Sequence, residues 1–167
     1  MMDAGVSITI DTAEVDRLLV RLGPVLDFDG AELMDIVGAV GESQTRRRIT
    51  DEKTAPDGTP WKANRAGTPI LQQTGRNLLD SVAYRASADE AEWGASWEYA
   101  HVHQEGATIE PTTAKALRFT GPGGETFFAQ KVTVPARPFV GLSADNLAEL
   151  GDVVTDFLRS LREEAGR

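Results

Sequence analysis

The stretch VPARPFVGLS, residues 134–143, connects the last predicted strand to the last predicted helix. Pro135 and Pro138 each fix their own φ at about −65° and disfavour helix in the residue before them. The backbone around Arg137 is therefore predicted to be extended and stiff, with one charged side chain projecting from it. We expect Arg137 to pair with a carboxylate of the same chain or of a neighbouring copy, because a planar guanidinium suits such pairing.

The helix that follows is predicted from a capping residue and an apolar stripe. Ser143 is a favourable N-cap, and Phe139 and Leu142 are expected to seat the helix on a sheet. Apolar residues then recur at helical spacing, which indicates one face packed against the core. The stripe consists of Leu147, Leu150, Val154, Phe157, Leu158 and Leu161.

A longer helix is predicted upstream, from Asp29-Gly30 to Ile49. Its first half has apolar residues at helical spacing, whereas its second half, GESQTRRRIT, has little apolar surface, so one of its faces is predicted to contact solvent or a partner. Arg46 and Arg47 belong to a basic triplet in its last turn. These arginines either stabilise the negative end of the helix dipole or contact a phosphate or an acidic partner.

The N-terminal region is predicted to form a short strand and a short helix. Residues 6–11, VSITID, alternate apolar and polar side chains, which indicates a strand. Asp11 or Thr12 is expected to cap a leucine-containing helix, and Gly23-Pro24 ends it.

Residues 51–75 are rich in Pro, Gly, Thr, Asp and Lys and show no strong periodicity, so we predict an extended loop or an arm. Within this segment PDGTPW, residues 56–61, has the composition of a tight turn, because proline presets one dihedral angle and glycine allows a positive φ. Trp61 is expected to anchor the returning chain, and it is also a candidate contact for a partner.

Two hairpins are predicted in the second half of the chain. The first joins residues 77–87 to residues 90–100, with Val82 and Tyr84 on one face and Trp93 and Ala95 on another. The second joins residues 114–120 to 125–134 through the turn GPGG. This glycine cluster lacks the lysine and the helix start of a phosphate-binding loop.

Phe127 and Phe128 are adjacent on the second hairpin. Successive side chains of a strand point to opposite faces, so we expect one ring in the core and the other outside. The outward ring is a candidate subunit contact.

Length and composition limit which architectures and which classes of function are possible. The 167 residues are expected to form one α+β domain: a small, mostly antiparallel sheet with two hairpins, packed by a long central helix and a C-terminal helix, plus a long extended loop. The absence of cysteine excludes disulfides, thiolate catalysis and cysteine-based zinc sites. No membrane segment is expected. A formal charge of −9 is opposite to that of most freely binding nucleic-acid proteins.

The strongest catalytic candidate is HVHQE, residues 101–105. On a strand, His101, His103 and Glu105 share a face and can hold zinc in a metal-dependent hydrolase. The neighbouring sequence instead predicts a short helix ended by Gly106, on which the two histidines do not converge. We therefore predict no catalytic residues, no metal and no cofactor, with one structural and one exposed histidine.

Four motifs in order resemble the phage virion morphogenesis family, the tail-completion proteins of Mu-like and related contractile-tailed phages. They are PDGTPW (56–61), ILQQTGRNLLDSV (70–82), YAHVHQEG (99–106) and PARPFVGLS (135–143). One departure is RRRITDEKTA before the first motif, where family members commonly carry an aromatic residue. The positions that carry the resemblance are Pro56, Asp57, Gly58, Gly75, Tyr99, His103, Gly106, Pro135 and Pro138.

The resemblance implies a structural protein of the virion neck, assembled in the host cytoplasm, that completes the tail or joins it to the head. It implies a hexameric ring around the DNA channel, with DNA passing through without specific binding. The implied partners are the tail tube or tail terminator on one side and head-completion or portal-side neck proteins on the other. A tail-assembly factor absent from the finished particle is the alternative. Candidate interface residues are Trp61, Arg46, Arg47, Phe127, Phe128, Arg137 and Phe139.

Overall fold

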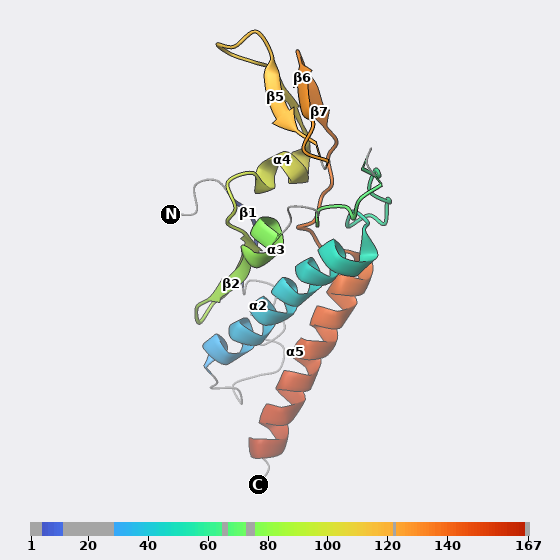
Figure 1. The fold of residues 1–167 in the computed structure, drawn as a ribbon. Coiled ribbons are helices and arrows are strands. Elements are labelled where there is room, and N and C mark those ends of the chain that lie inside the picture. The colour runs from blue at the N-terminus through green and yellow to red at the C-terminus, as the bar shows by residue number, and fades with distance from the viewer. Residues whose placement is uncertain (1–4, 12–28, 65–66, 73–75, 122, 166–167) are drawn as a thin grey trace.

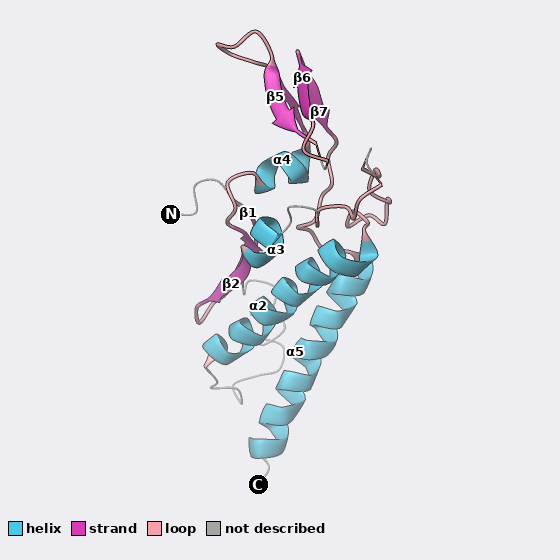
Figure 2. Ribbon diagram, in the orientation of Figure 1, coloured by secondary structure: helices cyan, strands magenta, loops and turns pink. Residues whose placement is uncertain are grey.

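The computed structural model describes residues 5–11, 29–64, 67–72, 76–121 and 123–165. The helix predicted between Thr12 and Gly23, and the motif residue Gly75, lie outside these described residues. The α+β architecture is confirmed: two long helices lie side by side, one antiparallel sheet lies beside them, and two smaller sheets lie toward one end of the molecule (Figures 1 and 2).

The largest sheet has three antiparallel strands in the order β1-β3-β2, which comprise Val6–Asp11, Glu90–Ala95 and Val82–Ala86. The predicted first hairpin is confirmed as β2–β3. Its register pairs Val82 with Ala95 and Tyr84 with Trp93. Directly opposed residues point to the same side of a sheet. The prediction that these two sets occupy different faces is therefore wrong.

Helix α2, Gly30–Arg47, packs across this sheet and continues as a π-helical turn, η1, Arg48–Glu52. Asp29 caps its start by accepting the backbone N–H of Ala31 at 3.0 Å. At Gly41 an added Cβ would lie 2.3 Å from the ring of Trp93, so the close approach of helix and sheet requires glycine there.

One face of the second half of α2 is exposed as predicted, at Ser43 and Arg47, but the opposite face is buried although its sequence is polar. Gln44, Thr45, Arg48 and Ile49 are all buried. The polarity has another cause, because these side chains form hydrogen bonds inside the molecule.

Helix α5, Ala144–Ala165, lies beside α2. The predicted cap is confirmed, since Ser143 Oγ accepts the backbone N–H of Asn146 at 3.1 Å. Leu150 and Phe157 of the predicted stripe are buried in one core cluster with Leu33, Met34, Val37, Ala91 and Trp93 of α2 and β3. Leu147 differs from the prediction, because 56% of it is exposed.

A second core cluster lies around the short helices α3, Arg76–Asp80, and α4, Ala100–Glu105. It contains Ile49, Trp61, Leu71, Leu78, Val82, Ala95, Ala100, Phe139 and Val140. Helix α4 confirms the short helix predicted before Gly106, whose φ is 76°.

Two small two-stranded sheets complete the fold. Strand β4, Ala107–Ile109, pairs with β7, Val132–Val134, and β5, Leu117–Thr120, pairs with β6, Thr126–Ala129. The glycine-rich turn predicted at 121–124 thus joins β5 to β6. This β5–β6 hairpin extends away from the two long helices (Figure 1).

Both phenylalanines of β6 are exposed, Phe127 to 45% and Phe128 to 69%. The expectation that one ring enters the core is therefore wrong. The physical reason is the position of the hairpin: neither core cluster of the described residues includes a residue of β5 or β6. Within the described part of the chain, no helix is long and apolar enough to cross a membrane.

Candidate functional site

The motif-rich segment 134–143, called the hub from here on, is contacted by side chains from three other parts of the chain. It runs from the end of β7 to the cap of α5 and has no strand partner after Val134. Its peptide groups are bonded by side chains instead, one from α4, one from the 51–75 loop and one from η1.

Gln104 of α4 makes the most complete of these contacts. Its Oε1 accepts the backbone N–H groups of Phe139 at 3.0 Å and Val140 at 3.1 Å, and its Nε2 donates to the carbonyl of Val140 at 2.9 Å. At the same junction the backbone N–H of Arg137 donates to the carbonyl of His103 at 2.7 Å. The YAHVHQEG motif therefore holds the hub through backbone positions 137 to 140.

The 51–75 loop meets the hub from another side. Trp61 is buried, and its Nε1 donates to the carbonyl of Pro138 at 3.2 Å, which confirms it as an anchor. Arg137 donates from Nε and Nη2 to the carbonyl of Lys62 at 3.1 and 2.9 Å, and from Nη2 to Asn64 Oδ1 at 2.9 Å. The partner of Arg137 thus lies in the same chain and is a carbonyl and an amide, not the predicted carboxylate. Burial lowers the pKa of this guanidinium.

Arg48 supports the hub from the helix side, and sequence reasoning missed it. Its side chain is buried, with Nη1 donating to the carbonyl of Gly141 at 2.6 Å and Nη2 to Asn146 Oδ1 at 2.5 Å. Its Nε lies 3.5 Å from a carboxylate oxygen of Glu52. Its spacing in the sequence could have indicated the buried position, because Arg48 lies on the same helical face as Gly41 and Gln44.

The other two arginines of the triplet also work inside the chain. Arg46 donates to the carbonyls of Leu79 at 2.9 Å and Val82 at 2.6 Å, which ties α2 to the start of β2. Arg47 forms ion pairs with Glu149 of α5 at 2.9 Å and Glu52 at 3.2 Å. These hydrogen bonds raise the pKa of Arg47 and lower that of Glu149.

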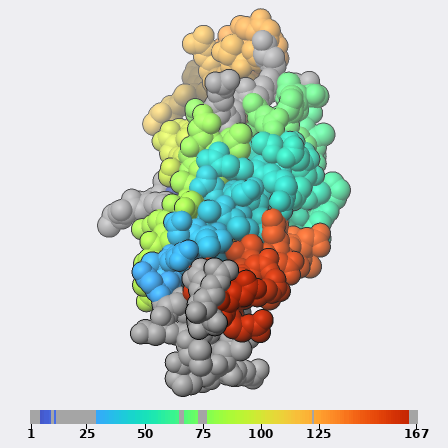
Figure 3. All heavy atoms as spheres, turned by 90° about the horizontal axis from the view of Figure 1, so that it is seen from below, coloured from blue at the N-terminus to red at the C-terminus, as the bar shows by residue number. Residues whose placement is uncertain are grey.

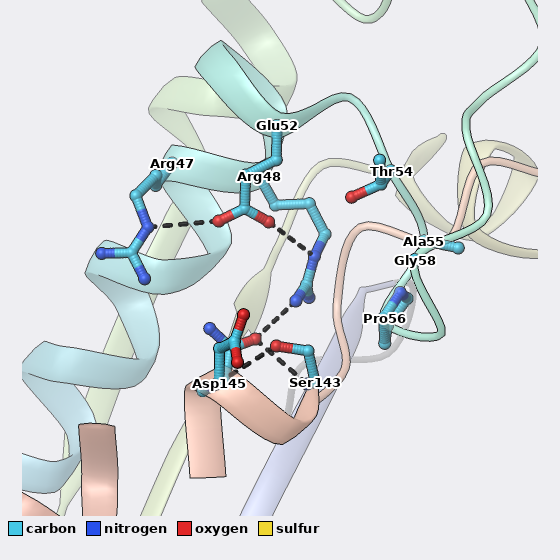
Figure 4. Close-up of a pocket in the computed structure, with 10 residues that line it drawn as sticks. Arg47, Arg48, Glu52, Thr54, Ala55, Pro56, Gly58, Ser143 and Asp145 are labelled. Carbon is cyan, nitrogen blue, oxygen red and sulfur yellow. Dashed lines mark hydrogen bonds and ion pairs between the residues drawn. The ribbon is translucent and has the colours of Figure 1, made fainter. Parts of the chain in front are cut away.

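A cleft of about 450 Å³ lies where η1, the PDG turn and the start of α5 meet (Figure 4). Gly58 has a φ of 84°, and Asp57 Oδ1 accepts the N–H of Thr59 at 2.9 Å, which confirms the predicted turn and lowers the pKa of Asp57. An added Cβ at Gly141 would lie 2.2 Å from Pro56. The cleft is lined by Arg47, Arg48, Glu52, Thr54, Ala55, Pro56, Gly58, Ser143, Asp145 and Asn146.

The charges in this cleft are of both signs, and the buried arginine is already bonded to protein atoms. Arg48 and Glu52, which both belong to η1, form an ion pair on one side of the cleft, as the close-up shows. The arrangement therefore joins three elements rather than presenting an open set of donors to a ligand.

The histidines lie on α4 as the helical prediction requires. His101 is exposed, whereas His103 is half-buried and stacks on Trp97 with ring centroids 5.7 Å apart. Burial and the charge of Arg137 lower the pKa of His103. Among the described residues its buried Nδ1 has no hydrogen-bond partner, so none of their carboxylates orients the ring through that nitrogen as in a catalytic triad. Within the described ranges, no three metal-binding side chains come together.

The predicted interface residues thus fall into two groups. Trp61, Arg137 and Phe139 are buried within the chain, and the heads of Arg46 and Arg47 are bonded within it, so partner contacts by these five stay predictions. Phe127 and Phe128 are exposed on the β5–β6 hairpin. There Phe127 stacks on Phe119 with centroids 5.9 Å apart.

Comparison with known proteins gives one family and one curated relative. The model of the phage virion morphogenesis family matches residues 10–159. The Mu-like prophage FluMu G protein 1 of Haemophilus influenzae is 25% identical over 166 aligned residues, which cover 92% of this chain and 95% of that protein. No solved structure matches.

Proposed function

This chain belongs to the phage virion morphogenesis family, a structural family, and on that premise we propose that it completes the tail of a phage particle and joins it to the head as a ring around the DNA channel. The observation that carries the proposal is the family match, which spans 150 of the 167 residues from position 10 to position 159. The relative encoded by a Mu-like prophage supports the same class of phage.

The hydrogen bonds that the motif side chains form support a structural role. In an enzyme, motif side chains converge on a site with unpaired donors, acceptors or nucleophiles. Here Trp61, Gln104 and Arg137 instead bond backbone groups of their own chain. The motifs therefore build a stiff scaffold, and the scaffold presents an exposed hairpin to a partner.

The charge of the chain supports a role around DNA that slides. A lumen lined by acidic residues repels phosphate and lets DNA pass without adhering. The formal charge of −9 fits such a conduit. The lumen of the assembled ring is expected to be neutral or acidic, and a strongly basic lumen in an image of the assembly would contradict this part of the proposal.

The proposed partners follow from the position in the neck. One face of the ring meets the tail tube or the tail terminator, and the other meets head-completion or portal-side neck proteins. The protein acts in the virion neck after assembly in the host cytoplasm.

Deletion of the gene from the phage or prophage tests the proposal. The expected result is filled heads and tails that stay unjoined, or tails of abnormal length, with normal particles restored when the gene is supplied on a plasmid. Normal virions in the deletion strain would overturn the proposal. Mass spectrometry of purified virions then separates a neck component, which is present in them, from an assembly factor, which is absent.

A further inference from the structure

The β5–β6 hairpin presents a residue pair that its own chain leaves uncovered. In the register of the hairpin Arg118 stands directly opposite Phe128, so both side chains are on one face. Phe128 is 69% exposed, and Arg118 is exposed as well. The opposite face carries the stacked rings of Phe119 and Phe127, which stiffen the hairpin. A two-stranded hairpin is marginal alone in water, so a partner surface adds to its stability.

An exposed strip of small, apolar and acidic residues lies on α5. Leu147, Ala148, Gly151 and Asp152 are all exposed and follow one another at helical spacing; we call them the outer strip. A Cβ added at Gly151 would meet no atom within 4 Å, so the strip is open at that point. Leu147 is 56% exposed beside it. An aromatic ring fits over the small residues while Asp152 faces a cation.

The charges of the two segments are complementary. Residues 107–134 carry three basic and two acidic residues, so the rest of the chain has a formal charge of −10. Helix α5 alone carries six acidic and two basic residues. The segment that carries the hairpin, residues 107–134, thus has a net charge of +1 and α5 a net charge of −4, so the exposed Arg118 is attracted to the helix of a second copy.

One copy cannot make this contact with itself. The hairpin lies at one end of the molecule in Figure 1, whereas α5 starts near the middle and runs toward the other end, and in Figure 3 the residues of α2 and of the adjoining green segment separate their surfaces. Two different patches that match each other on distant parts of one chain produce head-to-tail contacts, which close into a ring when the rotation allows it.

We propose that Phe128 and Arg118 of one copy dock on the outer strip of α5 of a second copy, with the ring of Phe128 over Gly151 beside Leu147 and Arg118 paired with Asp152. The inference rests on the proposed function in taking a second copy as the partner, and it adds the surfaces that join the subunits.

Native mass spectrometry and sedimentation of the full chain test the contact. The wild-type protein is expected to self-associate, and Phe128→Ser is expected to weaken association by roughly 30-fold, as for an aromatic hot spot. Tyr99→Ser is the matched control, because Tyr99 is 51% exposed and lies outside both surfaces. A charge exchange checks the pairing: Arg118→Glu and Asp152→Arg each weaken association, and the double variant regains it.

Mixing tests the head-to-tail geometry. Phe128→Ser retains the strip, and Leu147→Asp retains the hairpin, so a mixture of the two is expected to form one-to-one complexes and nothing larger. A wild-type monomer at the highest concentration reached, or a mixture that stays monomeric, would overturn the proposal. Association unchanged in Phe128→Ser would also overturn it, even if that variant lost binding to a tail-tube protein. The deletion phenotype tests the proposed function separately from all of these outcomes.

Discussion

The hub and the β5–β6 hairpin differ in where their sequence signals lie and in what their side chains do. The hub contains the densest motif of the chain, its residues Arg137, Phe139 and Val140 are buried, and its peptide groups are bonded by side chains of the same chain. The hairpin carries no motif beyond its turn glycines, yet it exposes three phenylalanines. The recognisable residues of this protein therefore maintain its fold, whereas the surface that is accessible to a partner has little sequence signature.

The largest effect is expected from Arg48→Met, which removes the buried cation under the hub. The carbonyl of Gly141 then loses its donor and Oδ1 of Asn146 keeps only the backbone N–H of Ser143, so the free energy of unfolding should fall by about 3 kcal/mol. Denaturant titration measures it. Arg47→Met is the matched control: its side chain is 43% exposed, so about 1 kcal/mol or less is expected. Equal losses would show that burial at the hub is not what matters.

Two glycine substitutions compare the hub and the hairpin directly. Gly106 has a φ of 76°, and a Cβ there would lie 2.7 Å from the backbone N of Ala136, so Gly106→Ala adds a clash to backbone strain and should cost about 2–3 kcal/mol. Gly124 has a φ of 85° with nothing within 4 Å, so Gly124→Ala should cost only about 1 kcal/mol. Thermal unfolding of both variants checks the difference, and a reversed order would contradict this comparison.

A smaller effect on stability is expected when the pH is lowered, because His103 binds a proton less readily in the folded chain. Because its pKa is lower in the folded state than the ordinary value of 6.5, the unfolded chain binds more protons, and stability falls as the pH drops through about 6.5. His103→Asn should remove a loss of roughly 1 kcal/mol or less between about pH 7.5 and pH 5.5. Denaturant midpoints at both pH values measure this. The same pH dependence in both proteins would assign it to other groups.

The smallest effect on stability is expected in the hairpin. Phe128→Ser changes a side chain that neither described core cluster includes, so the free energy of unfolding of the monomer should change by no more than about 0.5 kcal/mol. Calorimetry on dilute protein measures it. A loss of several kcal/mol would mean that the hairpin is part of the folding unit, and it would remove the contrast with the hub.

Local signals predicted much of the architecture. The cap at Ser143, the turn at Gly58 and the end of α4 at Gly106 follow from conformational preferences of single residues, and all three are present. The spacing of α2 and α5 predicted two long helices, with α2 continuing as η1 to Glu52.

The features that the sequence did not predict depend on contacts between residues far apart in the chain. The buried face in the polar second half of α2 could not be predicted, because there Gln44 and Arg48 bond to Asn146, about one hundred positions away along the sequence. The partner of Arg137 is a main-chain carbonyl, which no residue type reveals. Phe127 and Phe128 follow the strand alternation, but alternation does not say whether a core lies on either side of the strand.

Gln104 shows how the chain crosses from its sheets to its last helix without a continuous ladder. Its amide offers the same acceptor and donor as a peptide unit, so the side chain acts as a neighbouring strand one residue long for Phe139 and Val140. Two prolines leave the hub with missing N–H groups, and a regular strand pairing would be incomplete there. A glutamate of the same shape would bring an acceptor to the carbonyl of Val140, so the geometry of this crossing depends on a single nitrogen atom.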